Sequence, residues 1–153
     1  YEGDVDPARS LTITQRLLAL GCYQVSLGDT IGVGTPLQTR KLCELFLAEL
    51  PSDQLALHLH DTRGTALANA LVGLELGVRD FDSSVAGLGG CPYAPGAAGN
   101  LATEDLVYML HGMGIETGID LEALIEAGRV AEAVTGRRLP GKVHQAGPFK
   151  LRS

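Results

Sequence analysis

Apolar and polar positions along the chain form blocks that alternate between two spacings. Blocks with a helical apolar spacing begin at capping signals, such as Asp6-Pro7 and the Thr35 to Gln38 capping-box spacing. Short apolar runs between these blocks predict strands. The expected helices cover 6–20, 35–50, a segment ending near 77, a segment after 103, and 120–136. The expected strands cover 22–27, 55–60 and about 78–84. The tail beyond 137 is expected to be irregular.

This order of elements is that of a parallel α/β fold. The strand signals begin at residues 22, 55 and 78, intervals that suit successive strand–helix units. A complete (β/α)₈ barrel needs about 250 residues, so a chain of 153 residues predicts either a partial TIM barrel or part of an open doubly wound sheet. Each polar cluster follows a strand, where both folds place their active sites.

Composition narrows the classes of function. The net charge is −6 without a basic block, so nothing favours binding to nucleic acid or to an anionic membrane. No apolar run approaches the roughly 18–20 residues that span a bilayer. The beginning, Tyr1-Glu2-Gly3-Asp4, is neither a secretory signal nor a transit peptide and lacks an initiator Met, so we expect the chain to be cut from a longer protein.

Two histidines in the second predicted strand give the strongest local signal. His58 and His60 are two positions apart, so both side chains face the same side of the strand and can approach one divalent ion. The alternative is a pair of hydrogen-bonded histidines at a strand end. Asp61, directly after them, could orient a ligand histidine as a hydrogen-bond acceptor.

The loop after the first predicted strand carries Asp29 and Thr30. Asp29 is a candidate general base or a hydrogen-bonding partner of the metal site. Its structural alternative is to accept hydrogen bonds from loop backbone amides.

The segment 85–99 is the most unusual stretch, because glycines surround a single cysteine, Cys91. Such a loop can approach a ligand closely, and its thiol is either an acid/base group or incidental. It lacks the Gly-Lys-Ser/Thr ending of a phosphate loop. The odd number of cysteines suits a reducing compartment, and Cys22 and Cys43 are expected in the core.

Asn100 follows that loop, and its amide oxygen could complete a hard-cation site for Mg²⁺ or Mn²⁺. The alternative is that Asn100 is only a turn residue. Glu104 and Asp105 are most simply acids in a first helical turn. His111 and His144 have no partner spacing and are expected on a helix surface and in the tail.

Four motifs together are more specific than any one of them. They are Ser26-Leu27-Gly28-Asp29-Thr30-Ile31-Gly32-Val33-Gly34-Thr35-Pro36, His58-Leu59-His60-Asp61-Thr62, Gly87-Leu88-Gly89-Gly90-Cys91-Pro92-Tyr93-Ala94 and Gly99-Asn100-Leu101-Ala102-Thr103-Glu104-Asp105. Through them the chain resembles the 3-hydroxy-3-methylglutaryl-CoA lyase family, from Tyr1 to about Val143. The His-x-His pair and a later Asn are shared with isopropylmalate and homocitrate synthases, whereas the Gly-Gly-Cys-Pro-Tyr-Ala loop distinguishes the lyase.

The resemblance implies a fold and a set of site residues. Residues 1–153 would be the C-terminal part of a single catalytic (β/α)₈ barrel domain, with its sixth to eighth strands, flanking helices and C-terminal helices, and without the N-terminal half. The implied metal ligands are His58, His60 and Asn100, the implied catalytic residues are Cys91 and Asp29, and Thr30, Asp61 and Glu104 would bind substrate or support the site.

The resemblance also implies a reaction, the Mg²⁺- or Mn²⁺-dependent cleavage of 3-hydroxy-3-methylglutaryl-CoA to acetyl-CoA and acetoacetate in leucine degradation and ketone-body formation. The family's first-strand Arg-Asp pair is missing, so the chain alone is expected to be inactive. The complete protein would bind a small acyl-CoA substrate as a homodimer, in a bacterial cytoplasm or a mitochondrial matrix. The alternatives are a related metallolyase acting on 2-oxo acids and a non-catalytic half-barrel.

Overall fold

A computed structural model describes residues 3–90 and 99–149 of the chain. It contains a three-stranded parallel sheet in the order β1-β2-β3, formed by Val25–Asp29, Leu55–Leu59 and Asp80–Asp82. Helices α2 (Pro36–Leu47) and α3 (Ala66–Leu76) connect the strands and pack against each other, while α1 (Pro7–Ala19) precedes the sheet. The expected parallel α/β class is confirmed, and three parallel strands are consistent with a partial barrel.

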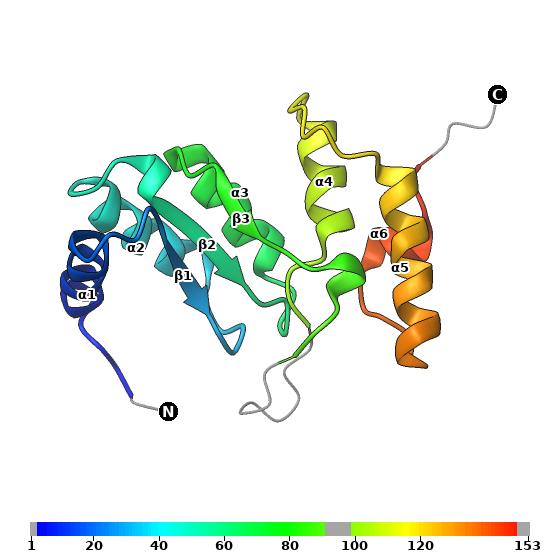
Figure 1. The fold of residues 1–153 in the computed structure, drawn as a ribbon, viewed down its shortest axis with the longest axis horizontal. Helices are drawn as coiled ribbons and strands as arrows, with labels where there is room; N and C mark the ends of the chain where they lie inside the picture. Colours follow the sequence, from blue (N-terminus) through cyan, green and yellow to red (C-terminus); the bar gives the residue numbers. More distant parts are fainter. Residues whose placement is uncertain (1–2, 91–98, 150–153) are drawn as a thin grey trace.

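The remaining helices form a second group beyond the sheet (Figure 1). This group comprises α4 (Thr103–Gly112), α5 (Leu121–Thr135) and α6 (Lys142–Ala146). Two short 3₁₀ turns, η1 (Ser52–Gln54) and η2 (Val85–Gly87), precede β2 and follow β3. Because η2 contacts both α4 and α5, it joins the sheet to the second group.

The core lies between β2 and the helices. Leu55, Leu57 and Leu59 are buried on one face of β2, and Phe46 of α2 is fully buried in the same cluster. Alternation along a strand turns His58 to the opposite face. Burying a side chain such as Phe46 contributes about 1.5–3 kcal/mol, so this apolar face fixes which side of β2 carries the histidines.

Local capping explains several helix boundaries. Thr35 and Gln38 form a reciprocal capping box at the start of α2, and Asp6 and Asp120 accept backbone hydrogen bonds at the starts of α1 and α5. Gly77 ends α3 in the left-handed conformation. These boundaries agree with the sequence expectations.

The first strand begins three residues later than expected, at Val25. Its register starts at the pair Val25 and Leu55, so residues 22–24 have no partner residues on β2. Cys22 is therefore exposed and the expectation that it lies in the core is wrong, whereas Cys43 is buried as expected.

The third strand is also shorter than expected, because Val78 still takes part in the turn that follows α3. The Val78 amide donates to the Gly73 carbonyl, and pairing with β2 starts only at Asp80.

The tail contains a helix that the sequence did not indicate. The Asp105 carboxylate accepts hydrogen bonds from the Lys142 and Val143 amides at 3.1 and 2.6 Å, so a side chain of α4 caps α6. The expectation of an irregular tail is therefore wrong for Lys142–Ala146. Among the described residues, no helix combines the length and apolar character needed to cross a membrane.

Candidate metal centre

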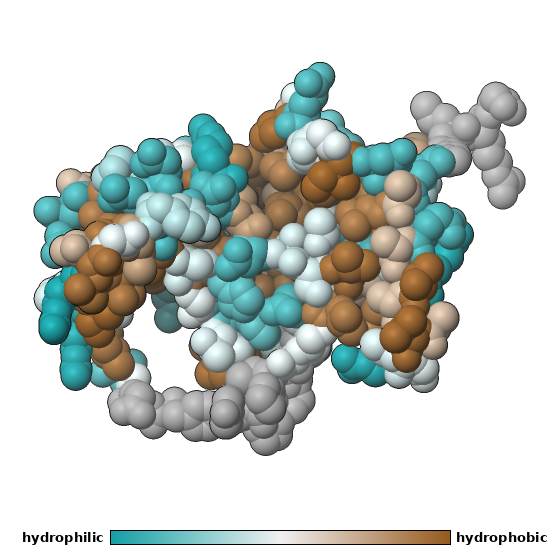
Figure 2. Space-filling model, in the orientation of Figure 1, coloured by the Kyte–Doolittle hydropathy of each residue, from teal (hydrophilic) through white to brown (hydrophobic). Residues whose placement is uncertain are grey.

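The face of the sheet opposite the helices carries polar side chains. Hydrophilic residues gather in the middle of the molecule in Figure 2, over the strands drawn in Figure 1. The parallel register aligns Gly28 with His58 and His58 with Asp82, so residues of three strands share one row across this face. Ser26 lies two residues before Gly28 and faces the same way.

The two histidines converge as the sequence predicts. The Nε2 atoms of His58 and His60 are 3.2 Å apart, which is the hydrogen-bonding distance of the alternative interpretation, and their ring centroids are 5.2 Å apart. Two neighbouring ligands at roughly 2.1 Å from one octahedral ion lie about 3.0 Å apart. Burial and the neighbouring His58 lower the pKa of His60, which favours the neutral imidazole that binds metals. The pair can therefore present two nitrogens to a single cation.

A carboxylate on the neighbouring strand contacts the first histidine. Asp82 Oδ2 lies 3.4 Å from His58 Nδ1 and accepts a 2.8 Å hydrogen bond from Ser26 Oγ. A carboxylate at Nδ1 fixes the tautomer that leaves Nε2 available to a metal. Asp82 was not among the predicted site residues, because a strand of three residues is too short for its periodicity to mark it.

Asn100 lies opposite His60. The two residues form an antiparallel bridge, in which the Leu101 amide donates to the Leu59 carbonyl and the Asp61 amide donates to the Gly99 carbonyl. This is the non-hydrogen-bonded type of pair, with Cα atoms typically about 4.5 Å apart and side chains close together. Asn100 Nδ2 donates to the Leu88 carbonyl at 3.0 Å, so the amide oxygen is the end that can act as a ligand.

Asp29 and Thr30 lie in the turn after β1. The Asp29 carboxylate accepts hydrogen bonds from the Val33 and Gly34 amides, both at 3.0 Å, which is the structural alternative stated above. Its charge nevertheless acts to raise the pKa of His60, whereas burial and the neighbouring His58 lower that pKa by more. The carboxylate is therefore close enough to act on the candidate centre. Thr30 is exposed next to it.

Asp61 is engaged away from both imidazoles. Its carboxylate accepts hydrogen bonds from the Ala66 amide at 3.0 Å and from Lys142 Nζ at 2.7 Å. This ion pair raises the pKa of Lys142 and ties α6 to the end of β2. The acceptor beside His58 is thus Asp82 rather than Asp61.

Glu104 lies in the first turn of α4 and His144 lies on α6, and both side chains are buried. Glu104 Oε2 accepts a 2.7 Å hydrogen bond from the Ala86 amide, and burial raises the pKa of Glu104. His144, which has no partner spacing in the sequence and was expected in the tail, lies there on α6, and its Nε2 is 3.4 Å from Glu132 Oε1. His111 is exposed on α4, as expected, with a contact to Thr117. Cys91 lies outside the described residues.

The donor set fits a hard divalent cation. Within residues 3–90 and 99–149, no three His, Cys, Asp or Glu side chains are grouped so as to hold a metal ion. A candidate centre would instead combine the two imidazole nitrogens with the Asn100 amide oxygen. Three such ligands would leave positions open for substrate or further ligands, as in catalytic metal sites.

Parallel strands joined by helices, with polar residues at the carboxyl ends of the strands, are the arrangement found in the class of (β/α)₈ barrels. The family model described as HMGL-like matches residues 1–131. The chain belongs to this family, as its motifs indicated.

Individual relatives agree with this assignment. The chain is 56% identical over 146 residues to the mitochondrial hydroxymethylglutaryl-CoA lyase of Bos taurus, covering 95% of the chain and 45% of that protein. It is 50% identical over 152 residues to the cytoplasmic 3-hydroxy-3-methylglutaryl-CoA lyase of Rattus norvegicus, covering 99% and 44%.

A solved structure shows the same fold. An HMG-CoA lyase from Acinetobacter baumannii, in complex with coenzyme A and 3-methylmalate, superposes with a TM-score of 0.92 at 40% identity, covering 100% of the chain and 50% of that protein. The chain thus spans about half the length of the relatives it matches.

Proposed function

We propose that residues 1–153 are the C-terminal part of the single catalytic barrel of a 3-hydroxy-3-methylglutaryl-CoA lyase, with β1, β2 and β3 as its sixth to eighth strands. The complete protein would cleave 3-hydroxy-3-methylglutaryl-CoA to acetyl-CoA and acetoacetate. The observation that carries this proposal is the 3.2 Å approach of His58 Nε2 to His60 Nε2, beside Asn100.

In this proposal His58, His60 and Asn100 hold Mg²⁺ or Mn²⁺. A bound divalent ion supplies Lewis acidity to the hydroxyl and carboxylate oxygens of the substrate. Asp82 and Ser26 orient His58, and the Leu88 carbonyl orients the Asn100 amide.

Two further residues move protons. Asp29, held by the Val33 and Gly34 amides, is a candidate base for the C3 hydroxyl proton, with one of the two histidines as the alternative, and loss of that proton drives cleavage of the carbon–carbon bond. Cys91 is the candidate acid that protonates the acetyl-CoA carbanion. Acid/base assistance of this kind typically contributes ~10²–10⁴-fold to the rate.

The remaining site residues support the centre. Thr30 is exposed beside Asp29, where it can contact substrate. Asp61 and Glu104 act on the surrounding backbone, through the Ala66 and Ala86 amides.

The assembled enzyme would take a small acyl-CoA substrate and form a homodimer, in a bacterial cytoplasm or, in a eukaryote, a mitochondrial matrix. Leucine degradation and ketone-body formation are the processes that this reaction serves. The chain alone would be inactive without the first-strand Arg-Asp pair.

Metal binding tests the centre directly. In the complete protein, His60→Ala and Asn100→Ala should each weaken Mn²⁺ binding by at least 10-fold in calorimetric titrations. His111→Ala, which removes the exposed histidine of α4, is the matched control and should bind as wild type. Unchanged Mn²⁺ affinity in His60→Ala would contradict the proposed metal centre.

Turnover tests the reaction class. Acetoacetate should be released from the CoA thioester, whereas thioester consumption that requires a 2-oxo acid would indicate the related metallolyase instead. If the metal-loaded complete protein shows neither activity, that result would favour a non-catalytic half-barrel. Cys91→Ala should lose turnover while keeping Mn²⁺ affinity, and wild-type turnover would exclude Cys91 from the mechanism.

A further inference from the structure

Glu104 is a fully buried carboxyl group at the first turn of α4. Burying such a group is costly unless hydrogen bonds compensate. The hydrogen bond shown for this side chain runs from the Ala86 amide to Oε2, at 2.7 Å. The carboxyl group therefore acts on η2, the turn that joins the sheet to the second group of helices.

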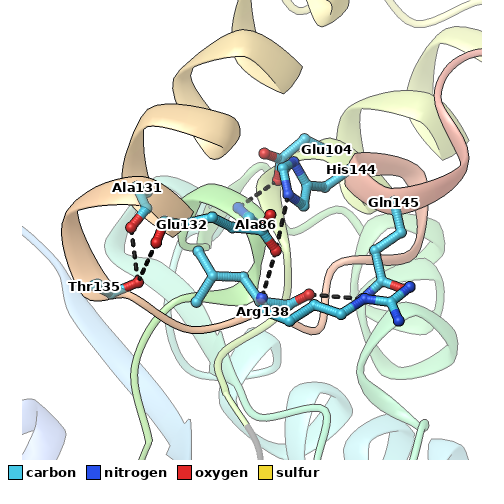
Figure 3. A network of polar contacts seen from close by, with 9 residues as sticks. Ala86, Glu104, Ala131, Glu132, Thr135, Arg138, His144 and Gln145 are labelled. Atoms are coloured by element: carbon cyan, nitrogen blue, oxygen red, sulfur yellow. Dashed lines mark hydrogen bonds and ion pairs between the residues drawn. The ribbon is translucent and has the colours of Figure 1, made fainter.

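Behind Glu104 lies a second buried group, His144 of α6 (Figure 3). Glu104 Oε1 and His144 Nδ1 are buried without a hydrogen-bond partner among the described residues. Both atoms lie within 3.0 Å of the position that a β-carbon on Gly128 would occupy, so both line the same small space against α5.

Glu132 holds the other side of the imidazole. Its Oε1 lies 3.4 Å from His144 Nε2 and accepts a 2.6 Å hydrogen bond from the Leu139 amide. Glu104 is thus packed between η2 on one side and a fixed imidazole on the other (Figure 3).

The residue that Glu104 holds has an unusual backbone conformation. Ala86 has φ 51° and ψ 20°, and it is the one non-glycine residue with positive φ in the described part of the chain. Such a conformation persists only where the surroundings enforce it. Its amide donates to Glu104, and its carbonyl accepts a 2.9 Å hydrogen bond from the Gly141 amide.

This turn leads directly to the candidate metal ligand. Two residues after Ala86, the Leu88 carbonyl accepts the 3.0 Å hydrogen bond from Asn100 Nδ2. Between them, the α-carbon of Gly87 faces the Asn100 carbonyl so closely that a β-carbon there would lie 3.4 Å from its oxygen. A shift of the Ala86 turn would therefore move the acceptor that orients the Asn100 amide.

We propose that Glu104 is a positioning residue for Asn100: its buried carboxyl group, backed by His144, fixes the Ala86 turn so that the Leu88 carbonyl aims the Asn100 amide oxygen at the metal. This inference rests on the proposed role of Asn100 as a ligand. It assigns Glu104 no contact with substrate.

Mn²⁺ affinity and amide exchange test the proposal in the complete protein. Glu104→Ala removes the acceptor and should weaken Mn²⁺ binding by roughly 10- to 100-fold, the range for residues that support metal ligands. Glu104→Gln keeps an oxygen for the Ala86 amide and should bind within a few-fold of wild type. Hydrogen exchange of residues 84–90 should accelerate in the alanine variant and not in the glutamine variant.

A matched control separates positioning from a general loss of stability. Val107→Ala truncates another buried residue of α4 and should lower the thermal midpoint while leaving Mn²⁺ affinity and exchange at 84–90 unchanged. If Val107→Ala weakens Mn²⁺ binding as much as Glu104→Ala does, the effect of Glu104 is only structural and the proposal fails.

A double-mutant cycle tests whether Glu104 affects Mn²⁺ binding through Asn100. In an Asn100→Ala background, Glu104→Ala should cost no further Mn²⁺ affinity. A full further loss there, or wild-type affinity in Glu104→Ala, overturns the positioning role while the metal centre stands. Unchanged affinity in Asn100→Ala alone would instead overturn the ligand role, and the positioning role with it.

Discussion

His58 and Asp82 are register partners on β2 and β3, and their side chains meet on the face opposite the helices, with Nδ1 3.4 Å from Oδ2. Ser26 of β1 donates to the same carboxylate oxygen. Residues of β1 and β3 therefore act together on the orientation of one imidazole on β2, the strand between them.

Asp82→Asn should weaken Mn²⁺ binding by roughly 10- to 100-fold, because His58 loses the carboxylate that fixes its tautomer. Asp80→Asn is the matched control: Asp80 lies on the same face of β3 but accepts from Gln24, away from His58. Titration calorimetry of both variants in the complete protein measures the effect. Equal affinities in the two variants would show that Asp82 does not support the ligand.

The sequence predicted the parts of this site that depend on local spacing. The separation of His58 and His60 by two positions puts both on one strand face, and Thr35 and Gln38 mark a helix start without tertiary information. Asn100 was also singled out from its place after the glycine-rich loop. Its position opposite His60 follows from a bridge that joins segments 40 residues apart.

What the sequence did not predict depends on contacts between distant segments. The strand Asp80–Asp82 is only three residues long, so its periodicity is too short to mark Asp82 as a site residue. Asp105 caps α6 from another helix, and His144 is buried only because α6 then packs against α4 and α5. Cys22 has apolar neighbours in the sequence, which led to the prediction that it lies in the core. It is exposed because residues 22–24 have no partner residues on β2.

The two described cysteines should differ strongly in reactivity. Cys43 is buried and desolvation raises its pKa to about 11, so only about one thiol in a thousand is ionised at pH 8. Cys22 is exposed. Iodoacetamide labelling of the native protein, followed by peptide mass mapping, should modify Cys22 at least 10-fold faster. The difference should disappear in concentrated urea, and equal native rates would contradict the burial of Cys43.

Gly99→Ala should destabilise the protein by at least about 2 kcal/mol, because a β-carbon at Gly99 would lie 1.7 Å from the Gly87 carbonyl oxygen and the backbone must move. Gly112→Ala is the control, since a β-carbon on this helical residue meets open space. It should change stability by no more than about 1 kcal/mol, in the stabilising direction. Urea midpoints compare the two variants, and a neutral Gly99→Ala would show that the two segments are not packed together.

The contribution of Glu132 to stability should depend on pH in a defined direction. The hydrogen bond from the Leu139 amide, followed by contacts with His144 and Arg138, lowers the pKa of Glu132 below its ordinary value of 4.5. A carboxyl group whose pKa is lowered in the folded state contributes stability that is complete above its unfolded pKa and is lost as the pH falls through its folded pKa. Glu132→Gln keeps an oxygen for the Leu139 amide but not the charge, so it should be less stable than wild type at pH 7, with the difference vanishing in acid. Urea midpoints between pH 7 and pH 3 measure this, with Glu49→Gln as an exposed control. A difference that stays constant over this range would mean that the charge of Glu132 contributes nothing and that only its shape matters.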